Sequence, residues 1–305
     1  MTVRQPPGVE PRWAESWYFD FATAAGDDVT GGFLRLSLFP NLGVAWLWAA
    51  WVAGDRLVIV RDHEVPLPRG AGLEVRAGGL WADLICETAA THWTLGLEAF
   101  GLGLDDPVEA LGAERGERVP LGFDLEWEAA EPAFTFPEPT ARPHHGHVQH
   151  GGRVHGDVLV GADRIAFDGW GVHDHFWGVR DWWGAGWHWA GGRVESNLAF
   201  SVAHPDTPGP EHATGYTARD GEDPHPVAFA EIETERDARG LPRSATYRFD
   251  SGLAVDATVV GLAPLRIPSL DGGRDAQLIR ALCRFTAPNS SPGAGWAEWL
   301  STPRG

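Results

Sequence analysis

Apolar and polar residues alternate along many short stretches of the chain, the pattern of β-strands with one buried face. In residues 33–39 (FLRLSLF), three leucines would face one side of a sheet, and the other side would carry Phe33, Arg35, Ser37 and Phe39. In residues 121–128 (LGFDLEWE), four apolar residues share a face opposite three acids. Similar runs, bounded by Gly, Pro, Asp or Asn, recur between residues 17 and 260. The pattern predicts an all-β protein of antiparallel barrels or sandwiches.

Helical periodicity is weak, so we expect few and short helices. Residues 105–119 have a patchy helical period that two glycines interrupt, and residues 275–285 fit a helix or a strand equally well. A proline-rich stretch at residues 130–146 has little periodicity and suits a connector between two β units. We therefore predict two domains, residues 1–140 and residues 141–305, with residues 204–215 as an exposed loop or lid.

Composition narrows the classes of partner. Hydrophobic residues make up 43% of the 305 residues, enough for a full core. The formal net charge is −18 and the chain has no lysine, which disfavours nucleic acid and anionic membrane surfaces. The longest apolar run, residues 42–53, is shorter than the ~20 residues that a membrane-spanning helix needs. We expect a cytoplasmic protein with a small-molecule partner; the pairing of Cys86 with Cys283 and a homodimer stay open.

One segment, residues 169–190 (GWGVHDHFWGVRDWWGAGWHWA), concentrates tryptophans, histidines and acids. If its first part is a strand, Asp174 shares a face with Val172 and Phe176, opposite His173 and His175. Burial among apolar neighbours would raise the pKa of Asp174 and keep it protonated, as a general acid requires. Nearby indoles would stabilise a carbocation by cation–π attraction, worth about 0.5–2 kcal/mol per ring.

Two stretches resemble a known family. Residues 15–21 (ESWYFDF) resemble the E-W-W-Y start of AttH-like proteins, with Ser16 departing from it. Residues 151–182 resemble the G-x-V-x-G strand and D-H-x-W-G-x-R-D-W motif of carotenoid 1,2-hydratase (hydroxyneurosporene synthase) and tocopherol-cyclase-like proteins. The motif positions here are Asp174, His175, Trp177, Gly178, Arg180, Asp181 and Trp182. Carotenoid hydratases have a Tyr two positions before their catalytic Asp, where this chain has Val172, and this weakens the specific hydratase assignment.

The resemblance implies tandem lipocalin-like barrels around an apolar cavity, and hydration or cyclisation without a redox cofactor. Our leading hypothesis is acid-catalysed hydration, cyclisation or isomerisation of an apolar, isoprenoid- or terpenoid-like substrate. Asp174 would be the acid, His175 its partner and His188 a proton relay. Candidates for substrate contact are Trp17, Tyr18, Gln149, Trp177, Arg180, Trp182, Trp183, Trp187 and Trp189.

Other interpretations stay open. A non-catalytic carrier of a lipophilic ligand would use the same cavity, with Asp174, Arg180 and Asp181 as a structural ion-pair network. A metal-dependent enzyme would use His173 and His175, because alternate strand residues can ligate one ion. We expect neither a metal nor a cofactor. The sequence contains no G-x-S-x-G elbow, phosphate-binding loop, dinucleotide fingerprint or C-x-x-C pair, which disfavours hydrolase, kinase and dehydrogenase classes.

Overall fold

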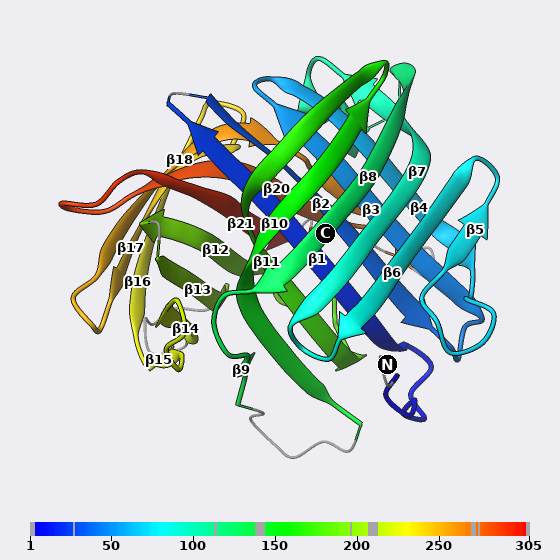
Figure 1. Cartoon of the computed structure of the whole chain (residues 1–305), viewed down its shortest axis with the longest axis horizontal. Helices are drawn as coiled ribbons and strands as arrows, with labels where there is room; N and C mark the ends of the chain where they lie inside the picture. The colour runs from blue at the N-terminus through cyan, green and yellow to red at the C-terminus, as the bar shows by residue number, and fades with distance from the viewer. Residues whose placement is uncertain are drawn as a thin grey trace.

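The computed structural model describes residues 4–26, 28–112, 115–137, 144–195, 197–206, 213–269, 273 and 275–302. These residues form two large antiparallel sheets (Figure 1). Apart from strands they contain one short 3₁₀ helix, η1 (Pro107–Leu111). Over these ranges, no helix has the length and apolar character needed to cross a membrane. The all-β prediction is confirmed.

The first sheet holds eleven strands, ordered β4-β3-β2-β1-β11-β10-β8-β7-β6-β5, with β9 added beside β10. A further pairing of β4 with β7, from Leu57–Leu104 to Ile59–Leu102, closes the sheet into a barrel. The strands are β1 (Trp13–Ala25), β2 (Asp28–Phe39), β3 (Val44–Ala53), β4 (Arg56–Pro66), β5 (Val75–Ala77), β6 (Leu80–Thr88), β7 (His92–Leu104), β8 (Glu117–Ala129), β9 (Phe134–Thr135), β10 (Gly146–Val160) and β11 (Asp163–Val179).

The second sheet holds ten strands, ordered β15-β14-β13-β12-β21-β20-β18-β17-β16, with β19 beside β20. Its strands are β12 (Trp187–Glu195), β13 (Leu198–Pro205), β14 (Thr214–Arg219), β15 (His225–Val227), β16 (Ala230–Arg236), β17 (Pro242–Phe249), β18 (Ala254–Leu262), β19 (Leu265–Ile267), β20 (Ala276–Thr286) and β21 (Gly293–Ser301). Of the ambiguous residues 275–285, residues 276–285 thus lie in the strand β20. The described part of residues 105–119 contains η1 and the first residues of β8.

The sheets change between β11 and β12, at residues 180–186, and not near residue 140. β10 and β11 pair with β8 and β1, so residues 146–179 complete the first barrel. The boundary that we expected at residue 140 therefore does not coincide with the change of sheet. The proline-rich stretch lies between β8 and β10, which belong to the same sheet. Its residues 138–143 lie outside the described residues, as do residues 207–212 of the expected lid.

The three largest apolar cores among the described residues follow from the alternation of side chains. One fills the first barrel and includes the three leucines of residues 33–39. Another lies inside the curve of the second sheet. The third lies between the sheets and takes Phe33 and Phe39 from the opposite face of the same strand. β1 is buried on both faces because it separates the first core from the third.

Candidate functional site

A pocket of about 150 Å³ lies between the two sheets, within the third core. Its walls come from β1, β2, β10 and β11 of the first sheet and from β12, β13 and β21 of the second. Six of the residues that the sequence singles out line it: Tyr18, Gln149, Asp174, Arg180, Trp187 and Trp189. The pocket is therefore where the tryptophan-rich segment meets the N-terminal strand.

Asp174 faces this pocket from β11 and is 4% exposed. The alternation of the strand puts it on the same side as Val172, as expected, and Val172 packs in the third core. Cross-strand pairing sets Gln149 of β10 directly beside Asp174. Gln149 Nε2 donates to Asp174 Oδ2 at 2.7 Å, and His147 Nε2 makes a close contact with the same oxygen.

Hydrogen-bond directions favour the carboxylate form of Asp174. The indole N–H of Trp189 can only donate, and it donates to Ser201 Oγ at 3.1 Å. Ser201 must then donate to Gln149 Oε1, at 2.6 Å, which turns the amide N–H₂ of Gln149 toward Asp174. Each link in this chain delivers a donor to the carboxyl, so Asp174 is held as an acceptor, the role of a carboxylate.

The electrostatics agree with that charge state. Burial by itself raises the pKa of Asp174, but His147 opposes it by its charge and hydrogen bond. The charges of Arg180 and Arg35 add to this effect, and the net pKa lies below the usual range of an aspartate. The expectation that burial keeps Asp174 protonated is therefore wrong, because the sequence did not reveal the basic groups around it.

A second acid–base pair lies beside the first, because Tyr18 is the cross-strand neighbour of Asp174. The Tyr18 hydroxyl donates to Asp20 Oδ2 at 2.9 Å, and the Val172 N–H donates to Asp20 Oδ1 at 2.8 Å. Burial raises the pKa of Asp20 to about 7, although these two hydrogen bonds oppose the rise. Near neutral pH the Tyr18–Asp20 pair can therefore hold or release a proton.

A buried ion pair, Arg280 with Glu298, lies beside Tyr18. The Arg280 guanidinium lies over the Tyr18 ring at 4.4 Å and over the Phe33 ring at 4.1 Å. It is fully buried and pairs with Glu298, whose Oε1 lies 2.5 Å from Arg280 Nη2. Glu298 also lines the pocket. Neither Arg280 nor Glu298 stands out in the sequence, because each belongs to an ordinary strand of the second sheet.

The remaining histidine candidates lie away from the pocket. His175 is on the opposite face of β11, where its Nε2 is 2.9 Å from Glu15 Oε1 and its ring stacks on Trp17. His188 points into the second core, 3.0 Å from the Tyr247 hydroxyl, and burial lowers its pKa to about 3. His175 does not contact Asp174, because consecutive strand residues face opposite ways. His188 does not contact it either, because it faces the second core from β12. His147 takes the place that we expected for His175.

The other aromatic candidates divide between two places. Trp17 is in the first core, and Trp177 contacts His175 on the same side of β11. Trp182 and Trp183 pack in the third core near the pocket. His173 stacks on Phe19 inside the first barrel, and in the described ranges no group of three or more His, Cys, Asp or Glu side chains is placed to hold a metal ion.

Sequence reasoning missed several pocket residues, and two of them had a usable signal. His147 alternates with the predicted Gln149 along one strand, so the two share a face, but the histidine-rich stretch around them resembles an exposed loop. Arg35 alternates with Phe33 on an otherwise apolar face. Ser201 comes from the second sheet and only the tertiary structure brings it to Gln149.

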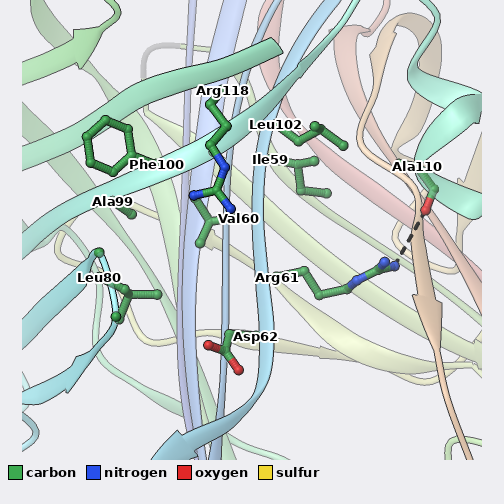
Figure 2. Close-up of a pocket in the computed structure, with 13 residues that line it drawn as sticks. Ile59, Val60, Arg61, Asp62, Leu80, Ala99, Phe100, Leu102, Ala110 and Arg118 are labelled. Atoms are coloured by element: carbon green, nitrogen blue, oxygen red, sulfur yellow. Dashed lines mark hydrogen bonds between the residues drawn. The ribbon is translucent and has the colours of Figure 1, made fainter. Parts of the chain in front are cut away.

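A separate pocket of about 250 Å³ lies on the first barrel and contains none of the sequence-predicted residues (Figure 2). Its charged residues are Arg61, Asp62 and Arg118. Arg61 Nη1 donates to the carbonyl oxygens of Ala110, at 3.4 Å, and Arg266, at 3.1 Å. Arg61 thus ties η1 and the strand β19 to the first barrel, which is a structural role.

Two lipocalin-like β units with a pocket between them define an AttH-like fold, and solved structures with this fold confirm the resemblance seen in the sequence. An AttH protein from Nitrosomonas europaea has a TM-score of 0.62 and 13% sequence identity to this chain. The match covers 96% of this chain and 94% of the AttH chain. Kievitone hydratase from Nectria haematococca has a TM-score of 0.59 and 12% identity, with 98% and 93% covered. CghA, also solved with Sch210972, has a TM-score of 0.52 and 11% identity, with 99% and 93% covered.

Within this class, the sequence matches the family described as "Domain of unknown function (DUF7064)" over residues 1–303. The chain belongs to that family. No curated protein matches the sequence. At identities of 11–13%, the solved structures establish the fold and leave the chemistry to the residues of the pocket.

Proposed function

We propose that the protein is an enzyme that hydrates or cyclises a small unsaturated substrate by proton transfer alone, in the pocket between the two sheets. The observation that carries this proposal is the chain of donors from Trp189 through Ser201 and Gln149 onto Asp174. It keeps a buried carboxylate in contact with His147 at the pocket wall. The hydratase among the proteins of this fold supports the same class of reaction.

In the proposed hydration, His147 is the general acid. Its imidazolium form, stabilised by the Asp174 carboxylate, gives a proton to one carbon of the double bond. A water molecule attacks the other carbon and loses a proton to Tyr18, which passes its own proton to Asp20. The product is an alcohol, and His147 regains its proton from Asp20 through solvent. In a cyclisation, a second double bond of the substrate attacks the carbocation in place of water, and the resulting ring cation loses a C–H proton to Tyr18 to leave a new double bond.

The wall opposite these groups suits an electron-poor intermediate. Trp187 and Trp189 of β12 line the pocket, and an indole face attracts a cation by about 0.5–2 kcal/mol. The pocket also exposes Arg35 and Arg180, which are poor neighbours for a pure hydrocarbon. We therefore replace the isoprenoid hydrocarbon expected from the sequence by an unsaturated substrate with polar groups.

The test is a set of variants assayed in ¹⁸O-labelled water with kievitone and a panel of alkenyl phenols and alkenyl carboxylic acids, followed by mass spectrometry. We expect wild-type protein to add labelled water to a panel member, and His147→Gln to lower the rate at least ~10²-fold. His225→Gln, an exposed residue of β15, is the matched control and should keep the rate.

A folded His147→Gln protein with full turnover would remove this assignment. Binding of a panel member without turnover by the wild type would favour the alternative of a non-catalytic carrier.

A further inference from the structure

Two arginines that the proposed reaction does not use reach the pocket from different elements. Arg35 projects from β2, and Arg180 follows the end of β11. Arg35 donates from Nε to Ser37 Oγ at 3.0 Å and from Nη2 to Ser16 Oγ at 2.9 Å. These bonds fix the plane of the Arg35 guanidinium and leave its Nη1 without a hydrogen bond to any described residue.

Arg180 is less satisfied than Arg35. Its only ionic contact among the described residues is with Asp174 Oδ1, 4.0 Å from its Nη2, which is too long for a hydrogen bond. It makes no hydrogen bond to a described residue. Its guanidinium is positioned instead by ring faces, at 4.3 Å from Phe176 and 5.3 Å from Trp182. The donors of Arg180 are therefore held in place but unused.

One indole organises both cations. The Arg35 guanidinium lies 5.3 Å from the same Trp182 ring, and 5.6 Å from Trp48. Stacked guanidinium groups lose little freedom when they bind a planar anion, because their donor geometry is already set. The arrangement is a preorganised fork of unused N–H groups at the wall of a pocket.

Among the described residues, Asp174 is the one carboxylate within ion-pair distance of this fork, 4.0 Å from Arg180, and it is shared with His147. The facing titratable groups are Tyr18, Arg35, His147, Asp174, Arg180 and Glu298, with Asp20 and Arg280 behind them. Glu298 is paired with Arg280, and Asp174 is paired with His147. No carboxylate of a described residue lies within ion-pair distance of Arg35. Burial and the charge of Arg180 lower the pKa of Arg35 to about 9, so Arg35 remains charged at neutral pH.

Buried charges of one sign are costly until an opposite charge joins them. We propose that Arg35 and Arg180 form the anion subsite of this pocket, and that the substrate carries a carboxylate or phenolate oxygen conjugated to its reactive double bond. This inference rests on the proposed function. Two fixed cations would balance the charge of the bound anion and orient its conjugated double bond in the pocket that His147 lines. A volume of about 150 Å³ holds one aromatic ring or a chain of similar size.

The experiment compares the binding of matched anionic and neutral probes by isothermal titration calorimetry. The carboxylate arm uses trans-cinnamate against cinnamamide, and the phenolate arm uses 4-nitrophenolate at pH 8 against 4-nitroanisole. We expect one anion to bind wild-type protein at least tenfold more tightly than its neutral partner. Arg180→Gln and Arg35→Gln should abolish that ratio, whereas Arg35→Lys, which keeps the charge but loses the fork, should reduce it.

Arg153→Gln is the matched control, because Arg153 pairs with Asp168 on the exposed surface of the first barrel. Circular dichroism checks that each variant is folded. Three outcomes would each overturn the subsite. They are equal binding of the anion and its neutral partner in both arms, no binding of either anion at millimolar concentration, and an unchanged affinity ratio in the glutamine variants. Binding involves no proton transfer, so anion selectivity retained in an inactive wild type would contradict the proposed reaction and leave the subsite intact.

Discussion

Asp20 allows the electrostatics of the pocket to be tested without knowledge of the substrate. It is 1% exposed, and burial raises the pKa of its carboxyl from 3.8 to about 7. The folded protein therefore binds more protons than the unfolded chain between these two values. The contribution of Asp20 to stability is fully present below pH 3.8 and is lost as the pH rises through about 7. One pKa unit corresponds to about 1.4 kcal/mol, so the loss over this window is about 4 kcal/mol.

The change that isolates this contribution is Asp20→Asn. Asparagine can still accept the Val172 N–H and meet the Tyr18 hydroxyl, but it cannot acquire a charge. The free energies of unfolding of both proteins are measured by urea unfolding between pH 4 and pH 8, with tryptophan fluorescence as the probe. We expect their difference to move by about 4 kcal/mol in favour of the variant as the pH rises. Other titrating groups act in both proteins and cancel in that difference.

Asp163→Asn is the matched control, because Asp163 is exposed at the start of β11. Its difference from wild type should stay constant over the same pH range. A constant difference for Asp20→Asn as well would refute the reasoning, since it would mean that Asp20 is already ionised in the folded protein at low pH.

Three further predictions follow from other contacts. Glu298→Gln leaves Arg280 buried without its carboxylate and should lower the free energy of unfolding, measured in urea, by about 3–5 kcal/mol. The double variant Arg280→Met with Glu298→Leu should recover most of that loss. Equal losses in the single and double variants would contradict this prediction. Gly171→Ala should abolish soluble folded protein, because an added Cβ overlaps the Asp20 carbonyl oxygen. Gly72→Ala is the control, because a Cβ there lies in open space and should leave folding intact. The yield of soluble protein and its circular dichroism spectrum test both expectations. If the carboxylate form of Asp20 accepts the proton from water, kcat/KM should rise with pH through an inflection near pH 7, which Asp20→Asn should remove.

The strands and their faces followed from the sequence because side-chain alternation is local. The leucines of residues 33–39 do face the first core and their phenylalanines the third, and Asp174 does share its face with Val172. The resemblance over residues 15–21 and 151–182 led to the correct fold. It also brought together two strands that pair in the structure, since Tyr18 lies opposite Asp174.

The sheet to which each strand belongs, and the groups that surround Asp174, were decided only by the tertiary structure. The sequence placed His175 beside Asp174 because the two are consecutive, yet a strand turns consecutive side chains to opposite faces. His147, Arg35 and Ser201 come together through strand pairing and sheet packing between segments far apart in the chain. Those neighbours reverse the direction in which burial alone would shift the pKa of Asp174. A charge state depends on every group within a few ångströms, and that distance is defined only once the chain has folded.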